Sequence, residues 1–330
     1  MNNPIKVALV GYGMSSKVFH APLLNLLNEF EVVLVLERSK SDSIHDFPKV
    51  KIVRELDEVL KHEEVDLVVI TTPNHLHYSH AKAALLAGKH VVIEKPFTVS
   101  IPEAEELIAI AKEVNKVLSV FHNRRWDSDF IWLKELVNSG INVYEIDSRF
   151  DRFRNYLKGW KEQTGDGTGI LYDLGSHLID QVVTLFGDDL ELKYVDLKKQ
   201  RDVAETTDYF EIHFQANETK IVLKAGMLCS HSHRLKVDTA LGTFIKEKPD
   251  VQEGVLKQQG VSFSRSDVYA EEIIHYTSEG KKEVLYLPKG AYLNFYTHLA
   301  KSINEDGPNP VTPESALKVM QWIENINNFN

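Results

Sequence analysis

Residues 5–16 read Ile-Lys-Val-Ala-Leu-Val-Gly-Tyr-Gly-Met-Ser-Ser, and this stretch decides the fold. The apolar run 5–10 is typical of a buried strand, and a segment with helical periodicity follows at 16–28. Gly11 permits a tight turn, and Gly13 lets the backbone approach a ligand at the helix N-terminus. A glycine-rich turn between a strand and a helix predicts a dinucleotide-binding unit, in which backbone N–H groups contact a pyrophosphate.

The third position of this turn is Ser16, which is small but is not glycine. A G-x-G-x-x-S pattern is weak alone, and its place between strand and helix strengthens it. We therefore expect Met14, Ser15 and Ser16 to join Gly11 and Gly13 in binding the cofactor.

Strand-like and helix-like segments alternate through the first 121 residues. This alternation indicates βαβ units, a doubly wound parallel sheet and right-handed crossovers. The predicted N-terminal domain is therefore a Rossmann domain covering 1–121. Its expected strands lie near 5–10, 31–36, 51–53, 66–71, 90–93 and 117–121, and its expected helices near 16–28, 76–87 and 101–114.

The end of the second strand carries signals for both nicotinamide cofactors. Glu37 stands about 20 residues beyond the turn, where an acid binds the ribose hydroxyls of NAD. Arg38, Ser39 and Lys40 follow directly and could hold the 2′-phosphate of NADP instead. The cofactor is therefore predicted as NAD(P), with the choice between NAD and NADP open.

Polar residues also follow the fourth strand. We expect Thr71, Thr72, Pro73 and Asn74 to form a wall beside the cofactor, and His77 to lie with them. His75 and His80 are close in sequence, but the spacings do not place the three histidines on one face of a strand or helix. A metal site is the weaker interpretation, and we predict none.

The apolar run 90–93 predicts a buried strand, and Glu94, Lys95 and Pro96 follow it. Ligands of open α/β sheets bind at the carboxyl ends of the strands, where Lys95 would lie. Pro96 fixes its own φ and restricts Lys95 to extended geometry, which would hold the ammonium in place. A solvated lysine at a strand end is the alternative.

After residue 121 the pattern changes to runs of strands with few helices between them. This predicts a second domain, 122–330, of α+β type with a large, mostly antiparallel sheet and helices on one face. We expect strands near 143–153, 192–200, 208–215, 219–228, 234–238 and 283–287, and helices near 128–138, 290–305 and 313–327. The pattern assigns nothing to 248–282.

A glycine-rich loop at 165–169 enters a helix that carries Asp173, His177 and Asp180. Spacings of four and three place these side chains on one helical face. A carboxylate beside an imidazole orients the ring and raises its pKa, so a general base is one interpretation. The alternatives are a helix-capping Asp173 with a core His177, or a two-ligand metal site.

The composition limits the kinds of partner. A formal net charge of −10 over 330 residues argues against nucleic acid and anionic membranes as partners. No apolar run is long enough to span a membrane, and no signal-peptide pattern opens the chain. Cys229 is the single cysteine, which fits a reducing compartment, so we expect a cytoplasmic protein.

Four motifs in this order resemble the glucose–fructose oxidoreductase / inositol 2-dehydrogenase / rhizopine-catabolism (Gfo/Idh/MocA) family. They are the Gly11-x-Gly13 turn, Thr72-Pro73-Asn74, Glu94-Lys95-Pro96, and the glycine-rich loop running into Asp173-Leu174-Gly175-Ser176-His177-x-x-Asp180. Segments at 18–22, 122–127, 152–154 and 250–253 are similar to the subgroup with bacterial NADP-dependent scyllo-inositol dehydrogenases. Two positions differ from that subgroup: Glu37 replaces a small residue, and Asn155 a proline.

The resemblance implies an NAD(P)-dependent dehydrogenase that acts on a secondary alcohol of a cyclic polyol or sugar. It implies that Lys95, Asp173 and His177 are catalytic and also contact the substrate. It further implies a homo-oligomer, dimer or tetramer, formed through the C-terminal sheet. Glu94, Lys95 and Asn123 are expected on the cofactor, and Arg124, Arg152 and Tyr156 on the substrate.

Two other functions remain open at this stage. A dinucleotide-binding sensor without catalysis could use the same fold, although it would not need Lys95, Asp173 and His177 together. An oxidoreductase acting on an imine or a tetrapyrrole is the other. His20 could face the nicotinamide side, whereas Tyr292 and Tyr296 are expected in the core.

Overall fold

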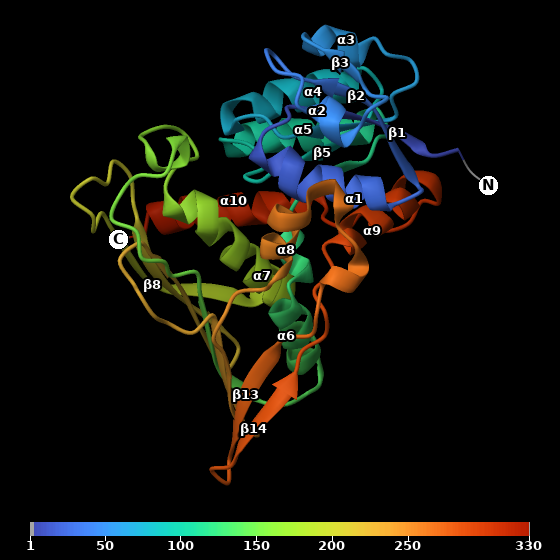
Figure 1. Ribbon diagram of the computed structural model, residues 1–330. Helices are drawn as coiled ribbons and strands as arrows, with labels where there is room; N and C mark the ends of the chain where they lie inside the picture. The colour runs from blue at the N-terminus through green and yellow to red at the C-terminus, as the bar shows by residue number, and fades with distance from the viewer. Residues whose placement is uncertain (1–2, 330) are drawn as a thin grey trace. The chain divides into compact units, whose positions relative to one another are not determined.

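The computed structural model describes residues 3–329, and these fold into two compact units (Figure 1). Unit 1 contains the chain up to Asn123 together with Val251–Val268 and Ala291–Leu317. Unit 2 contains Arg124–Asp250, Tyr269–Gly290 and the chain from Lys318 onward. The sequence-based boundary after residue 121 had assigned all of 122–330 to the second domain, whereas two later segments pack with unit 1.

Unit 1 is built on a six-stranded parallel sheet in the order β3-β2-β1-β4-β5-β6, within the described residues 3–329. This confirms the expected Rossmann fold. The chain moves outward from β1 to β3 and then returns to β4 on the other side of β1. The carboxyl ends of β1 and β4 therefore mark the topological switch point where such sheets bind ligands. The strands are β1 Ile5–Val10, β2 Phe30–Leu36, β3 Lys51–Val53, β4 Leu67–Ile70, β5 His90–Ile93 and β6 Leu118–Val120.

The helices of unit 1 come from distant parts of the chain. Figure 1 shows α1, near the start, beside α8 and α9 from the last third of the sequence. The helices are a π-helical turn Ser16–His20, α1 Ala21–Leu26, α2 Ser43–Asp46, α3 Leu56–Leu60, α4 His77–Leu86, α5 Ile101–Glu113, α8 Gln252–Gln259 and α9 Leu293–Asn304. α10, Pro313–Asn327, begins in unit 1 and continues in unit 2.

Unit 2 is built on an eight-stranded sheet, counted over residues 3–329, in the order β14-β13-β12-β11-β7-β10-β9-β8. Only the β7–β10 pair among these described strands is parallel, which confirms the expected mostly antiparallel sheet. The strands are β7 Val143–Arg149, β8 Leu190–Lys198, β9 Tyr209–Ala216, β10 Thr219–Gly226, β11 Leu235–Thr239, β12 Gly242–Lys246, β13 Glu272–Thr277 and β14 Lys282–Tyr286.

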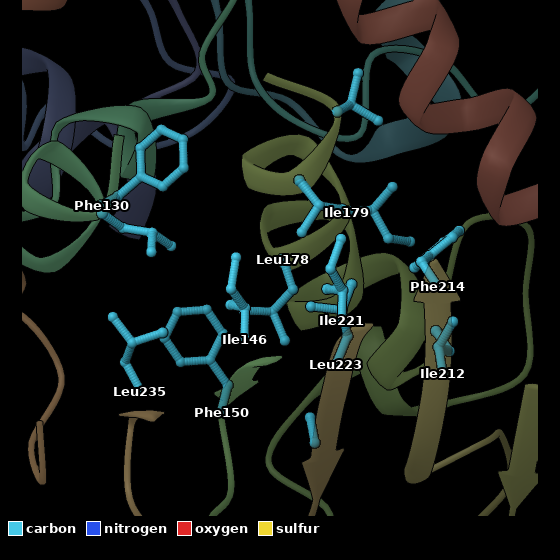
Figure 2. Close-up of a cluster of buried hydrophobic side chains, with 14 of the residues drawn as sticks. Phe130, Ile146, Phe150, Leu178, Ile179, Ile212, Phe214, Ile221, Leu223 and Leu235 are labelled. Atoms are coloured by element: carbon cyan, nitrogen blue, oxygen red, sulfur yellow. The ribbon is translucent and has the colours of Figure 1, made fainter. Parts of the chain in front are cut away.

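Helices α6, Ser128–Asn138, and α7, Ser176–Phe186, contribute to the core of unit 2 together with the sheet. Figure 2 shows Phe130 of α6 and Leu178 and Ile179 of α7 among Ile146, Ile212 and Ile221 of the strands. Every second residue of β9 is buried, so one face of the strand packs on the core and the other carries polar residues. The alternation along β9 is the signal that made this strand predictable.

Strands β12 and β13 and helix α8 were not predicted. β12 follows β11 after a short turn, and β13 and α8 lie in the polar stretch 248–282. These elements depend on pairing and packing with distant residues, so the local sequence carries little signal for them. Within residues 3–329 no helix is both long and apolar enough to cross a membrane.

Candidate active site

The glycine-rich turn packs Gly11 closely against Thr71 and leaves the backbone of Gly13 open. Gly11 has a φ of +96°, and an added Cβ there would lie 3.0 Å from the Thr71 hydroxyl oxygen. An added Cβ on Gly13 would meet no atom within 4 Å, so its backbone is open to a close ligand. The Ser16 hydroxyl lies 2.7 Å from the carbonyl oxygen of Gly11 and 2.7 Å from the Thr71 hydroxyl. These residues fit an NAD(P) cofactor.

Glu37 is buried and binds the loop that follows it. Its carboxylate accepts hydrogen bonds from the backbone N–H of Asp42 and of Ser43, both at 2.9 Å, and from the Ser43 hydroxyl. The guanidinium of Arg54 donates to the carbonyl oxygens of Glu37 and Lys40. The loop 38–42 is therefore held in one shape, and Arg38, Ser39 and Lys40 on it are exposed.

His77 is completely buried and joins two loops of the site. Its Nδ1 lies 2.8 Å from the carbonyl oxygen of Pro96, and its Nε2 lies 3.0 Å from that of Thr72. Burial lowers the pKa of His77, although both carbonyls oppose that shift. His77 thus connects the expected cofactor wall to the loop after β5. Among residues 3–329 no group of three or more His, Cys, Asp and Glu side chains could hold a metal ion.

Glu94, directly before Lys95, is the centre of a hydrogen-bond network in unit 1. One carboxylate oxygen accepts from the Ser15 hydroxyl and faces His20 Nε2 at 3.0 Å. The other accepts from the backbone N–H of Lys95 at 3.0 Å. Burial would raise the pKa of Glu94, but the hydrogen bonds from His20 and Ser15 and the charge of Lys95 lower the pKa to about 2. Glu94 is therefore ionised, and Lys95 follows it in a cis peptide with Pro96.

In unit 2 the glycine-rich loop leads into a π-helical turn, Leu171–Gly175, which continues as α7. Such turns within helices occur frequently at functional sites. Asp173 lies in the π-helical turn and His177 in the first turn of α7, so the regular α-helical spacing assumed from the sequence does not hold between them. Asp173 forms an ion pair with Lys161 at 2.9 Å, which the sequence did not predict. His177 is 7% exposed.

Asp180 has a structural partner. The guanidinium of Arg125 binds both of its carboxylate oxygens, with nitrogen–oxygen distances of 2.6 and 2.9 Å. Bidentate pairs of this kind fix both side chains. Asp180 therefore links α7 to the segment before α6.

The remaining expected substrate residues differ in exposure. Arg124 is buried over the ring of Phe150 and lies 3.3 Å from Asp127. Arg152 and Tyr156 are exposed on the segment 152–163. Arg201 anchors this segment because its guanidinium donates to the carbonyl oxygen of Tyr156 at 2.7 Å and pairs with Glu162 at 3.0 Å. Asn123 is buried at the end of unit 1, and Met14 in the turn is exposed.

Comparison with known proteins agrees with this geometry. A protein-family model described as "Oxidoreductase family, NAD-binding Rossmann fold" matches residues 5–122. A second, described as "Oxidoreductase family, C-terminal alpha/beta domain", matches 134–328. The chain belongs to the Gfo/Idh/MocA oxidoreductase family. It is accordingly an NAD(P)-dependent dehydrogenase of the class that acts on CH–OH donors.

Particular relatives cover almost the whole chain. The uncharacterized oxidoreductase YdgJ of Escherichia coli K12 is 40% identical over 98% of this chain and 96% of its own length. The NADP-dependent scyllo-inositol 2-dehydrogenase IolW of Bacillus subtilis 168 is 37% identical over 97% and 92%. The structure of the oxidoreductase yvaA from Bacillus subtilis has a TM-score of 0.92 and 34% identity, covering 99% of this chain and 97% of that one.

Proposed function

We propose that this protein transfers hydride between a secondary alcohol of a cyclic polyol or sugar, similar to scyllo-inositol, and NADP. The observation that carries the proposal is the anchoring of Lys95 at the carboxyl end of β5 by the ionised Glu94. An ammonium there can donate a hydrogen bond to an alcohol oxygen that becomes more negative as the C–H bond breaks. The similarity to IolW, a scyllo-inositol dehydrogenase by name, supports the substrate class.

In this proposal each catalytic side chain has a separate task. His177 takes the proton of the substrate hydroxyl as general base, and it returns the proton when a ketone is reduced. Lys95 stabilises the negative charge on the same oxygen. Asp173, which pairs with Lys161, orients His177 or a neighbouring hydroxyl of the substrate. When bound, the nicotinamide supplies the hydride acceptor.

NADP is the cofactor we propose, because the Glu37 carboxylate already accepts three hydrogen bonds from Asp42 and Ser43. A carboxylate committed to its own loop is poorly placed to bind ribose hydroxyls as well. The exposed cations Arg38 and Lys40 on the same loop are suited to a 2′-phosphate. Arg54 supports them by holding the carbonyl oxygen of Lys40.

We also propose that the protein is cytoplasmic and forms a homo-oligomer through the sheet of unit 2. The sheet face opposite the core carries cross-strand ion pairs such as Lys224–Glu211 at 3.2 Å and Lys220–Glu145 at 3.0 Å. Salt screens the interactions between exposed charges, so the association of two such faces should depend on ionic strength. Light scattering at low and high ionic strength tests this, and a monomer at both would count against it.

The functional test begins with fluorescence titrations of NADPH and NADH against the purified protein. A panel of inositols and aldoses is then followed at the nicotinamide absorbance, with Lys95→Ala and His177→Ala beside the wild type. We expect tighter binding of NADPH, turnover of an inositol and a loss of at least 100-fold in kcat in each variant. Full turnover by both variants would refute the mechanism, and tight NADPH binding without any turnover would favour the sensor.

A further inference from the structure

We propose that His20 and Tyr296 are positioning residues for the catalytic lysine, and that both act through Glu94. The inference rests on the proposed function because it takes Lys95 as catalytic. Neither residue needs to touch the substrate. All the residues involved belong to unit 1, although Tyr296 lies 276 positions after His20 in the sequence.

The three side chains form a continuous chain of hydrogen bonds. The Tyr296 hydroxyl lies 2.6 Å from His20 Nδ1, and His20 Nε2 lies 3.0 Å from a Glu94 carboxylate oxygen. His20 and Tyr296 are both 0% exposed. The rings of Phe121 and Phe30 pack against them, with centroids 4.3 Å from His20 and 5.5 Å from Tyr296. Water therefore does not compete for the hydrogen bond between Tyr296 and His20.

The ionised carboxylate of Glu94 determines where one proton of this chain lies. Glu94 is ionised and can only accept, so His20 Nε2 must carry the proton that is donated to it. The Tyr296 hydroxyl stays bonded to Nδ1 whether or not Nδ1 carries a proton, because it can accept from Nδ1–H or donate its own proton. Burial, chiefly, raises the pKa of Tyr296 well above its usual value, so the phenol keeps that proton. Tyr296 thus holds the His20 ring in the orientation that directs Nε2 at Glu94.

Glu94 transmits this constraint to two parts of the site. One oxygen, shared with His20, accepts from the Ser15 hydroxyl in the dinucleotide turn. The other accepts from the backbone N–H of Lys95. Glu94 is half-buried at the end of β5, and these partners fix its rotamer. Losing the His20 bond frees the carboxylate to turn, and Lys95 and Ser15 both lose a fixed partner.

Two substitutions of His20 separate hydrogen bonding from packing. The amide of His20→Gln can still donate to Glu94, whereas His20→Phe fills the ring volume but has no donor. If positioning is the role, His20→Gln keeps kcat within about 3-fold of wild type and His20→Phe lowers it about 10- to 100-fold, with little change in the KM for the polyol. If the ring only fills space, the order is reversed, because Phe is the better apolar replacement.

Tyr296→Phe removes only the hydroxyl, and we expect kcat to fall about 3- to 10-fold. Ser119→Ala is the matched control because it also deletes a buried hydroxyl of unit 1, bonded to the carbonyl oxygen of Val311 at 3.0 Å. Thermal unfolding should shift similarly in both, whereas only Tyr296→Phe should lower kcat. Equal kcat values for Tyr296→Phe and the control would overturn the inference.

The dissociation constant of NADPH provides a readout that does not need turnover, because Ser15 shares the Glu94 oxygen with His20. We expect His20→Phe to weaken NADPH binding about 10-fold and His20→Gln to leave it nearly unchanged. If the wild type turns over no polyol, the proposed function fails, and this titration alone decides the role of His20. Equal affinities for NADPH in the two variants would then refute it.

Discussion

Replacing Glu37 by Gln distinguishes two roles for this acid that predict opposite changes in cofactor preference. The position in sequence assigns Glu37 to the ribose of NAD, whereas the structure shows its carboxylate on the N–H groups of Asp42 and Ser43. Gln has one carbonyl oxygen, so it can keep the bonds from Ser43 but turns its own N–H₂ toward the N–H of Asp42. The hydrogen bond from the Asp42 N–H is lost. That N–H then faces the N–H₂ of the new amide, so two donors face each other without an acceptor.

The expected cost is about 2–3 kcal/mol, because hydrogen bonds to charged groups contribute about 1.5–3 kcal/mol each. For a unit of this size that corresponds to a decrease of about 5–10 °C in Tm, measured by differential scanning calorimetry. Glu58→Gln is the matched control, since the Glu58 carboxylate also accepts from two backbone N–H groups, those of Arg54 and Glu55. Glu58 is exposed, so its substitution should shift Tm less.

The direction in which the preference between NADPH and NADH changes distinguishes the two roles of Glu37. If Glu37 shapes the loop, its replacement loosens Arg38 and Lys40, so NADPH binding weakens more than NADH binding. If Glu37 binds the ribose, NADH binding weakens, and NADPH binding improves because a negative charge near the 2′-phosphate is removed. A rise in the preference for NADPH, with an unchanged Tm, would refute the structural reasoning.

Three further predictions concern the buried acids, the Asp173 pair and the turn. Burial, together with the carboxylates of Asp250 and Asp129, raises the pKa of Asp127 to about 8 against the pull of Arg124. The folded chain then keeps a proton that the unfolded chain releases above about pH 4, so the free energy of unfolding falls as the pH rises from about 4 to about 8. Asp127→Asn should remove this pH dependence of the free energy of unfolding, measured by urea unfolding. The same pH dependence in the variant and the wild type would contradict the prediction. Lys161→Met should lower kcat about 3- to 10-fold while shifting the free energy of unfolding by less than about 1 kcal/mol, because the ion pair with Asp173 is partly exposed; Lys158→Met serves as control, and an unchanged kcat would exclude a role for the pair. Gly11→Ala forces a Cβ into a φ of +96°, 3.0 Å from the Thr71 hydroxyl, and should cost about 1–2 kcal/mol in unfolding. Gly13→Ala should leave stability unchanged and weaken NADPH binding about 10-fold, and equal effects of the two variants in both assays would contradict this distinction.

Local patterns were sufficient to predict the first sheet. The apolar runs at 5–10 and 90–93 predicted buried parallel strands, because such strands are apolar on both faces. Gly11 and Gly13 predicted the turn, since Gly11 has a φ of +96° that favours glycine and Gly13 leaves its backbone open. The alternation in 209–216 predicted β9 in the same way, whereas the polar stretch 248–282 concealed α8 and β13.

The sequence therefore determined the parts whose physics is local: strand periodicity, the glycine turn, and a lysine at the end of β5. The orientation of polar side chains was decided by contacts between residues far apart in the chain. Glu37 lies where a ribose ligand is expected, yet its carboxylate binds its own loop. Tyr296 has the pattern of a core residue, yet its hydroxyl lies 2.6 Å from His20 Nδ1 in a hydrogen bond. A buried polar group must find a partner in the fold, and helical or strand periodicity does not reveal which partner it finds.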